Sequence, residues 1–569
     1  MQKIPLFFLV FPCLICAFLL APLTGIASPD TTSPEQLHLA LSETMRKIQP
    51  PLAEPDVNQT IKKPATINDW LNAIYDTAKL QPIWVTTTGP GKKAEILLAA
   101  LQNSSNDGLV PEHYQVSRIT SLWQSKAPDK LIELDTLLTT ALVLYGHDAQ
   151  YGRADSGKNN PALRAKNEDA LAFNGLTLTQ TALSSPDFNQ FLTSLFPPHK
   201  YYKNLRAALP HYQALDAAGG WPSVASGKSI HPGEQEARIP AIRTRLQGEG
   251  FLQSTASDSP VYDEPLVQAV TSFQRRHGLT DDGVIGQNTI AAMNIPAHHK
   301  VRQIILNLER WRWEAHDLGQ KYILVDIAGF TLEGIADNTV ILEMPVVVGA
   351  LHHETPIFSD QIEYMDLNPY WNIPVKIARD EMLDELKKNP NYLNAKHIRL
   401  FSDRTSEASE INPGSLNWKQ VSPQKMGQFK LRQDPGKWNA LGAIKFIFPN
   451  SFSVYMHDTP AQSLFKRSNR AFSHGCIRLG SPLKLAEFLM GGAEKGWPPE
   501  RFKGIIDTGT RTIIRLPEPL PVHITYQTVK SDQDGTIFFY PDIYNRDQQL
   551  EKLLFKEEIE DARNIQPSP

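Results

Sequence analysis

Cysteine is scarce in this sequence, and neither sign of charge is in excess. Only three of the 569 residues are cysteines, and two of them, Cys13 and Cys16, lie in an apolar segment at the N-terminus. If that segment is removed, Cys476 is the single remaining thiol, which excludes an intramolecular disulfide. Lys and Arg total 57 against 61 Asp and Glu, a net charge of -4, which argues against a nucleic-acid partner or binding to an anionic membrane surface.

The first 27 residues have the pattern of a signal peptide. Lys3 provides a positive start, an apolar run extends from Leu6 to Leu23, and the stretch Gly25-Ile26-Ala27 offers small residues to a signal peptidase. We therefore expect cleavage after Ala27 and secretion of the rest of the chain. The alternative is an uncleaved membrane anchor, because the apolar run is almost long enough to span a bilayer.

The remaining chain is too long for one hydrophobic core and has an ordinary globular composition, so we expect several domains. Residues 28–62 are rich in Pro, Ser, Thr and Gln, which predicts a flexible leader. Residues 63–236 predict a helical scaffold domain, because apolar residues recur every three or four positions, as at Leu134, Leu138 and Leu142. We find no catalytic constellation in this region and expect a scaffold or docking role.

A small module is predicted at residues 237–297. Asp263 is placed to cap a helix that ends at Gly278, and apolar side chains on one face of that helix include Leu266 and Phe273. The segment 273–289, with glycines at positions 278, 283 and 286, resembles the three-helix peptidoglycan-binding module found in many cell-wall enzymes. That resemblance implies binding to glycan or stem peptide, and the alternative is a module that binds neither.

The periodicity changes from helices to strands after a predicted bridging helix at 298–319. Alternating apolar residues predict strands at 321–327, 340–348, 443–448, 452–456 and 512–516. Between these strands, Asp380–Leu393 predicts a helix and residues 402–433 predict a long polar loop. An insertion at about 380–433 is large enough to be a lid over a site.

These patterns together predict a multidomain α+β fold. We expect a β-rich catalytic domain with a lid insertion at residues 320–517 and a C-terminal extension at 518–569. The most informative residues lie in the last third of the catalytic domain, where the lone thiol of Cys476 is found.

Two histidines are candidates for the base that a thiol nucleophile needs, because a thiol is a poor nucleophile while it is protonated. His474 lies two residues before Cys476, and His457 lies 19 residues before it, at the end of a predicted strand. A neighbouring strand end could place the ring of His457 beside the thiol. A lone cysteine is more often a buried apolar residue, but the run Ser473-His474-Gly475-Cys476 argues against that alternative.

This run, with Ile477 and Arg478 after it and His457 before it, resembles the active-site signature of the YkuD-type L,D-transpeptidase family. The order of helical scaffold, peptidoglycan-binding module and catalytic domain with a large lid resembles the large periplasmic YcbB-like subgroup, as does the segment Asn368–Pro374. The resemblance implies a periplasmic enzyme of a Gram-negative bacterium. It also implies that the enzyme forms 3→3 cross-links between peptidoglycan stem peptides without a cofactor, with other cell-wall enzymes as candidate partners.

Carried over position by position, the resemblance implies a role for each residue of the signature. Cys476 is the expected nucleophile and His457 the general base and later acid. The backbone N–H groups of Gly475 and Cys476 and the hydroxyl of Tyr455 are expected to stabilise the oxyanion. Ser473 is expected to shape the loop and to bind substrate, and His474 to shape the loop. Arg478 is expected to pair with a stem-peptide carboxylate. A structural ion pair is the alternative for Arg478.

Three other functions compete with this interpretation. A zinc site could use His457, His474 and Cys476, but the sequence has neither an HExxH nor a CxxC pattern, so no metal is expected. A hydrolase could use the same thiol and let water resolve the intermediate. The third alternative is a non-catalytic wall-binding protein that works through the small module.

Overall fold

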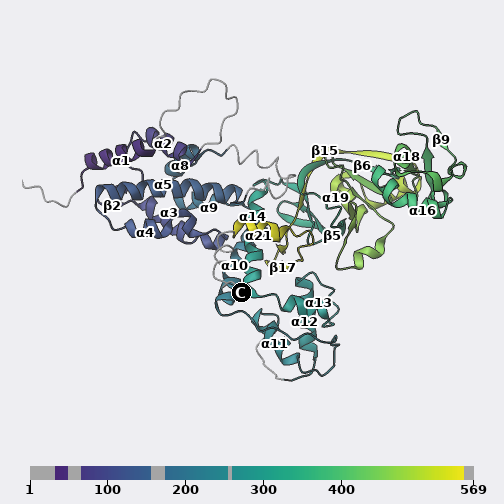
Figure 1. Cartoon of the computed structure of the whole chain (residues 1–569), viewed down its shortest axis with the longest axis horizontal. Coiled ribbons are helices and arrows are strands. Elements are labelled where there is room, and N and C mark those ends of the chain that lie inside the picture. Colours follow the sequence, from purple (N-terminus) through teal and green to yellow (C-terminus); the bar gives the residue numbers. More distant parts are fainter. Residues whose placement is uncertain (1–31, 49–65, 155–172, 254–258, 556–569) are drawn as a thin grey trace, which may run out of the picture.

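The computed structural model describes residues 32–48, 66–154, 173–253 and 259–555. Figure 1 shows an elongated molecule, with helices at one end, a β-rich domain at the other and a small helical module projecting from the middle. The predicted multidomain α+β fold is therefore confirmed. The predicted signal peptide, with Cys13 and Cys16, lies outside the described residues. Within the described ranges, none of the helices is both long and apolar enough to cross a membrane.

The helical domain is built around a long central helix, α5. Its helices are α1 (Pro34–Ile48), α2 (Ile67–Thr77), α3 (Lys92–Gln102), α4 (Val116–Leu122), α5 (Pro128–Tyr151), α8 (Gly175–Ser184), α9 (Phe188–Ser194) and α10 (Lys200–Ala217), with β1 (Val85–Thr86), β2 (Gly89–Pro90), η1 (Ser104–Asp107) and η2 (Pro111–Tyr114) between them. Buried Asp135 of α5 accepts hydrogen bonds from the backbone N–H groups of residues 83–85 and from the Tyr75 hydroxyl. This carboxylate therefore ties the start of the domain to its central helix.

The prediction of a flexible leader is wrong for residues 34–48. They form α1, whose Leu37, Leu41 and Met45 are buried in the core of the helical domain. The spacing of four between these apolar residues places them on one helix face. The Pro- and Ser-rich composition of the surrounding residues made this short apolar repeat difficult to detect in the sequence.

The small module contains the predicted helix and has a core of its own. It consists of α11 (Ile239–Gly248), α12 (Glu264–Arg276) and α13 (Gln287–Met293). The Asp263 side chain accepts from the Leu266 N–H, which confirms the predicted cap, and Leu266, Val270 and Phe273 are fully buried. The bridging helix α14 (Ala297–Trp313) follows the module and packs against α10 of the helical domain.

The β-rich domain is organised by a nine-stranded sheet with the order β13-β5-β14-β12-β11-β6-β15-β3-β4. Its strands are β3 (Lys321–Asp326), β4 (Thr331–Ala336), β5 (Thr339–Gly349), β6 (Phe358–Leu367), β11 (Ile444–Ile447), β12 (Met456–His457), β13 (Ala471–Ser473), β14 (Ile477–Leu479) and β15 (Thr512–Thr525). Because β4 also pairs with β5, all strands except β13 form a closed ring around an apolar core. Helices α19 (Pro482–Met490) and α20 (Pro499–Asp507) follow β14.

Two predictions about the ends of these strands need correction. The predicted strand at 452–456 is mostly a turn, in which the Asn450 side chain bonds both the N–H and the carbonyl of Val454. Strand β15 runs past the predicted domain end at residue 517, and residues 522–525 pair with β3 inside the sheet. The C-terminal segment then continues through β16 (Val529–Ser531), β17 (Ile537–Phe539) and α21 (Arg546–Leu554).

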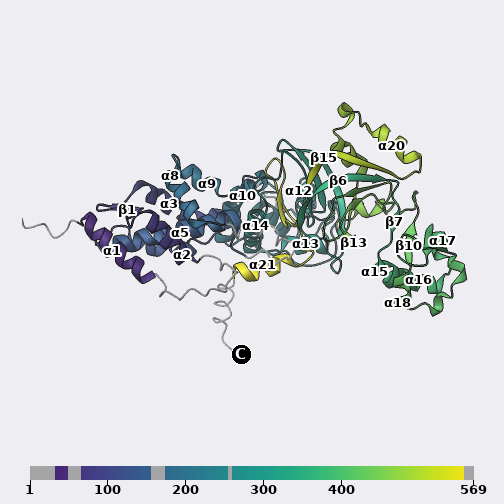
Figure 2. The same cartoon turned by 90° about the horizontal axis from the view of Figure 1, so that it is seen from above.

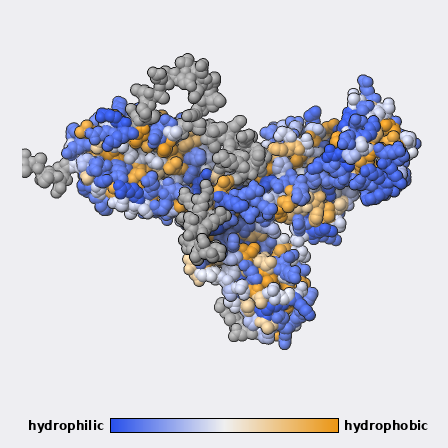
Figure 3. All heavy atoms as spheres, viewed as in Figure 1, coloured by the Kyte–Doolittle hydropathy of each residue, from blue (hydrophilic) through white to orange (hydrophobic). Residues whose placement is uncertain are grey.

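The predicted long polar loop at 402–433 is instead part of a folded subdomain, which we call the lid subdomain (residues 371–433). Its elements are β7 (Trp371–Asn372), α15 (Val375–Ile377), the π-helix η4 (Ala378–Met382), α16 (Leu383–Lys388), α17 (Tyr392–Ala395), β8 (Ile398–Phe401), β9 (Glu410–Ile411), η5 (Pro413–Ser415), η6 (Trp418–Gln420), α18 (Pro423–Gln428) and β10 (Lys430–Gln433). Its separate core includes Trp418, Met426 and Leu431. In Figure 2 it forms the end of the molecule opposite α1, and in Figure 3 its visible surface is mostly hydrophilic.

Candidate active site

Three neighbouring strands place the predicted nucleophile and base on one face of the sheet. Strand β12 lies between β11 and β14, with His457 opposite Arg478 on one side and opposite Lys445 on the other. Side chains alternate along a strand, and residues paired across strands share a face. Tyr455 and Cys476 lie two pairs earlier, beyond the pair Met456–Ile477, and the Ile477 N–H bonds the Tyr455 carbonyl at 3.1 Å. We call the face with Lys445, Tyr455, His457, Cys476 and Arg478 the thiol face.

His457 is held as a neutral base. Its Nδ1 lies 2.6 Å from the carbonyl oxygen of Asp458, which can only accept, so Nδ1 carries the proton and Nε2 has the free lone pair. Burial, together with the nearby charges of Arg478 and Lys445, lowers the pKa of His457 to about 3, although the hydrogen bond to the Asp458 carbonyl opposes the shift. Neutral imidazole is therefore the form present at neutral pH.

The thiol of Cys476 is protonated in this resting arrangement. Burial raises the pKa of Cys476, although hydrogen bonds from the backbone and hydroxyl of Tyr455 and the charge of Lys445 oppose the rise. Burial also raises the pKa of Tyr455, so its hydroxyl stays a hydrogen-bond donor. Cys476 is thus a neutral thiol and His457 a neutral imidazole on the same face of the sheet.

The loop that carries the thiol is held by hydrogen bonds from two side chains. One is Ser473 of the loop itself, and the other is Thr355, in the loop after β5. Ser473 Oγ donates to the Cys476 carbonyl at 2.5 Å and accepts from the Gly475 N–H at 3.2 Å. Thr355 Oγ1 donates to the Gly475 carbonyl at 2.9 Å. Gly475 has a φ of +106°, which a side chain would strain.

These bonds change two predicted roles. Ser473 is only 2% exposed and both its polar functions serve the loop, so the structure does not support our expectation that it binds substrate. The Gly475 N–H already donates to Ser473 and the Tyr455 hydroxyl is hydrogen-bonded to the Cys476 thiol, so the oxyanion donor left open in this arrangement is the Cys476 N–H. Among the described residues, the Cys476 N–H has no protein acceptor.

The two cations of the thiol face have no carboxylate partner in the described part of the chain. Arg478 Nε is buried without a hydrogen-bond acceptor, and the structural ion pair that we considered for Arg478 is not formed. The sequence interpretation missed Lys445. A signal was present, because Lys445 interrupts an otherwise apolar strand between Ile444 and Phe446.

His474 points toward the lid subdomain. Its Nε2 lies 2.5 Å from Glu381 Oε1 of η4, and its ring lies 4.6 Å from the ring of His353. A hydrogen bond also links Trp371, the first lid residue, to the Tyr455 hydroxyl. The lid subdomain therefore contacts both the thiol loop and the predicted oxyanion donor. Neither Glu381 nor Trp371 had been singled out from the sequence, because these contacts join distant segments.

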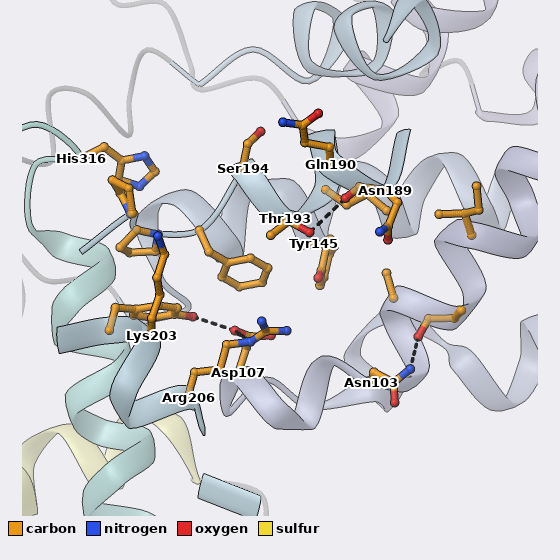
Figure 4. Close-up of a pocket in the computed structure, with 18 residues that line it drawn as sticks. Asn103, Asp107, Tyr145, Asn189, Gln190, Thr193, Ser194, Lys203, Arg206 and His316 are labelled. Carbon is orange, nitrogen blue, oxygen red and sulfur yellow. Dashed lines mark hydrogen bonds and ion pairs between the residues drawn. The ribbon is translucent and has the colours of Figure 1, made fainter. Parts of the chain in front are cut away.

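A metal centre and a ligand cavity are two other kinds of functional site. Within the described ranges, no three His, Cys, Asp or Glu side chains are grouped to hold a metal ion. A cavity of about 670 Å³ lies in the helical domain between α3, α9 and α10 (Figure 4). At its base, Asp107 accepts from the Tyr202 hydroxyl and pairs with Arg206 at 2.7 Å, so these polar groups satisfy one another and fasten α10 to η1. None of the thiol-face residues lines this cavity.

Three family models match successive parts of the chain. They are described as "Scaffold domain" at residues 69–209, "Putative peptidoglycan binding domain" at 235–293 and "L,D-transpeptidase catalytic domain" (YkuD) at 320–514. A curated protein of Haemophilus influenzae, described as "Putative L,D-transpeptidase", is 32% identical over 228 residues. The match covers 40% of this chain and 45% of that protein, so the chain spans less than half of that relative's length.

Solved structures of L,D-transpeptidases are also similar to the chain. One from Mycobacterium smegmatis is 13% identical, covers 36% of this chain and 58% of its own, and has a TM-score of 0.17. One from Stackebrandtia nassauensis is 13% identical, covers 55% of this chain and 100% of its own, and has a TM-score of 0.20. Residues 320–514 thus match the model of the L,D-transpeptidase catalytic domain, and they follow matches to the scaffold and peptidoglycan-binding domain models, an order consistent with a YcbB-like architecture.

Proposed function

We propose that the protein is a cysteine-dependent L,D-transpeptidase of peptidoglycan biosynthesis that acts outside the cytoplasm, in the periplasm. The observation that carries this proposal is the thiol face, where a neutral imidazole, a protonated phenol and a lone thiol are brought together by β12 and β14. The catalytic and peptidoglycan-binding family models support peptidoglycan as the substrate.

In the first half-reaction, the Cys476 thiol attacks the carbonyl carbon of the third residue of a donor tetrapeptide. His457 Nε2 accepts the thiol proton as the S–C bond forms, and the Cys476 N–H and Tyr455 hydroxyl donate to the oxyanion. His457 then gives the proton to the departing amine. The C–N bond breaks, D-alanine leaves and a thioester to Cys476 remains.

In the second half-reaction, the side-chain amine of the third residue of another stem attacks the thioester. His457 takes a proton from this amine, the new amide forms, and the proton returns to the sulfur as the C–S bond breaks. The product is a 3→3 cross-link. If water attacks instead, the product is a tripeptide, and the protein is an L,D-carboxypeptidase or endopeptidase.

The test is product analysis after incubation of the purified protein with disaccharide tetrapeptide. A cross-linked dimer with free D-alanine supports the transpeptidase, tripeptide without dimer supports a hydrolase, and unchanged substrate supports a non-catalytic wall-binding protein. Cys476→Ala and Cys476→Ser are expected to abolish turnover, because neither side chain supplies an acidic thiol. Product yields from these variants that match those of the wild type would remove Cys476 from the mechanism.

A further inference from the structure

Lys445 is a cation of the thiol face to which neither the motif nor the family resemblance assigns a role. It lies on β11, opposite His457 of β12, and its side chain is half-buried. Its Nζ lies 3.8 Å from the centre of the Tyr455 ring, a distance typical of a cation–π contact. The ammonium group is therefore held over the phenol that bonds the thiol.

The carboxylate best placed to neutralise Lys445 is already engaged. Asp366 lies opposite Lys445 on the neighbouring strand β6, but it accepts hydrogen bonds from Arg511 at 2.8 to 3.0 Å. No acidic side chain of the described residues forms an ion pair with Lys445 or with Arg478. The charge of Asp366 still raises the pKa of Lys445 against the effect of burial, but in the described part of the chain neither of these partly buried cations has a carboxylate of its own.

Such an arrangement is unfavourable in the free protein. Desolvation lowers the pKa of both Lys445 and Arg478, which records the cost of keeping them charged. A carboxylate that enters the site would gain charge-assisted hydrogen bonds from both groups. Two such cations on the face that carries a nucleophile therefore favour a ligand that itself contains a carboxylate.

We propose that Lys445 and Arg478 form one carboxylate-binding site, with which the protein selects donor peptides that have a free carboxylate on the leaving residue. This inference rests on the proposed function, in which the leaving D-alanine carries a terminal carboxylate. The planar guanidinium of Arg478 suits two parallel hydrogen bonds, whereas Lys445 supplies a compact charge. Lys445, which lies outside the sequence motif, is thus a residue that determines donor specificity.

The test compares two donors, a disaccharide tetrapeptide with a free terminal carboxylate and the same molecule with a terminal carboxamide. The full chain is compared with its Lys445→Met and Lys445→Arg variants and with Lys484→Met, which removes an exposed lysine of α19. We expect Lys445→Met to lower kcat/KM for the acid donor about tenfold or more, mainly through KM, and to affect the amide donor much less. Lys445→Arg is expected to retain most of the preference, and Lys484→Met all of it.

Binding measurements in a Cys476→Ala background separate this inference from the proposed function. Titration calorimetry with both donors does not depend on turnover, so it tests the carboxylate site even if the wild type forms no product. We expect the added Lys445→Met change to weaken binding of the acid donor about tenfold and to leave binding of the amide donor unchanged. Equal effects of Lys445→Met on both donors, in turnover or in binding, would overturn the inference.

Discussion

Glu381 Oε1 lies 2.5 Å from His474 Nε2, which joins the lid subdomain to the loop that carries the thiol. Glu381 belongs to the π-helix η4, and His474 is two residues before Cys476. Since both side chains are partly exposed, this contact can open without disturbing either core. The contact is suited to holding the lid subdomain over the thiol reversibly.

If this contact keeps water from the thioester, Glu381→Gln is expected to raise the ratio of tripeptide to cross-linked dimer. The reason is that a lid held less firmly admits water to the acyl-enzyme. Glu385→Gln is the matched control, because Glu385 lies on the adjacent helix α16 and pairs with the exposed Lys388 at 2.8 Å. The ratio is measured by chromatography of the products, and an unchanged ratio in Glu381→Gln would argue against a sealing role for the contact.

Excision of the lid subdomain tests the same role on a larger scale. Trp371 and Gln433 are paired partners on antiparallel strands, so the ends of the excised segment lie close together and a short glycine link can replace residues 372–432. We expect the catalytic domain to remain folded, because the lid subdomain has its own core. The tripeptide fraction should rise, while acylation of Cys476 by a carbapenem, followed by intact mass, should persist. Loss of thermal stability together with every activity would instead indicate a structural brace.

His457→Gln is expected to lower turnover about 100-fold or more, because it removes the general base, and His474→Gln is expected to have a smaller effect. The pKa of His457, lowered to about 3, predicts that wild-type activity persists well below pH 6. The raised pKa of Cys476 predicts that the rate of alkylation by iodoacetamide keeps rising above pH 9. A fast alkylation plateau below pH 6 would reveal a thiolate and imidazolium pair instead.

Tyr544→Phe is expected to lower kcat several-fold with little change in KM. The Tyr544 hydroxyl donates to the Gly349 carbonyl at 2.5 Å and accepts from the Thr355 N–H at 3.3 Å, and Thr355 in turn bonds the Gly475 carbonyl. Tyr544 is therefore a positioning residue for the thiol loop. Thr528→Val is the control, because it removes a hydroxyl from the same segment, one that donates to Asp547 at 2.7 Å. Equal falls in kcat for the two variants would mean that the C-terminal segment contributes only stability.

Lys300→Met is expected to stabilise the junction between the small module and the rest of the chain. Lys300 is fully buried, its Nζ lies 3.8 Å from the centre of the Phe539 ring, and burial lowers its pKa from 10.5 to about 7. Glu249, His277, Arg245 and Arg276 surround it. Because the folded pKa lies below the unfolded value, the unfolded chain binds more protons between pH 7 and pH 10.5.

The contribution of Lys300 to stability is therefore most favourable above pH 10.5 and is lost as the pH falls to 7. The methionine variant should be more stable by about 1–3 kcal/mol at pH 7, and its stability should rise less between pH 7 and pH 10. Thermal unfolding at pH 7 and pH 9.5 measures both effects. A lower thermal midpoint for Lys300→Met at pH 7 would show that the buried charge is well compensated.

Features of the fold set by neighbouring residues were predictable from the sequence, whereas those set by distant residues were not. Helix α12 was predicted because its cap at Asp263 and its apolar face lie within a few residues of one another. The core of the lid subdomain escaped prediction because Trp418, Met426 and Leu431 are separated by polar residues and lie on different short elements. Their burial depends on residues 373–400, which local periodicity does not include.

The same distinction holds for the candidate site. Cys476 and His457 were recognised because the residues around them form a specific motif. Glu381, Tyr544 and Lys445 reach the site by packing or by cross-strand pairing, and no local pattern identifies the partner of any of them. The engagement of the Gly475 N–H by Ser473 also depends on backbone geometry that residue types alone do not specify.

The pairing of residues 522–525 with β3 dictates when the catalytic domain can finish folding. The Thr525 hydroxyl bonds the Val325 carbonyl across a sequence separation of 200 residues, and such long-range pairing is slow to form. As the chain is synthesised from its N-terminus, the helical domain and the small module can fold early, while β3 keeps an open edge until the last strand arrives. An unpaired edge of this kind is a site for aggregation, so a chain cut at residue 514 should misassemble even though every residue of the thiol face is present.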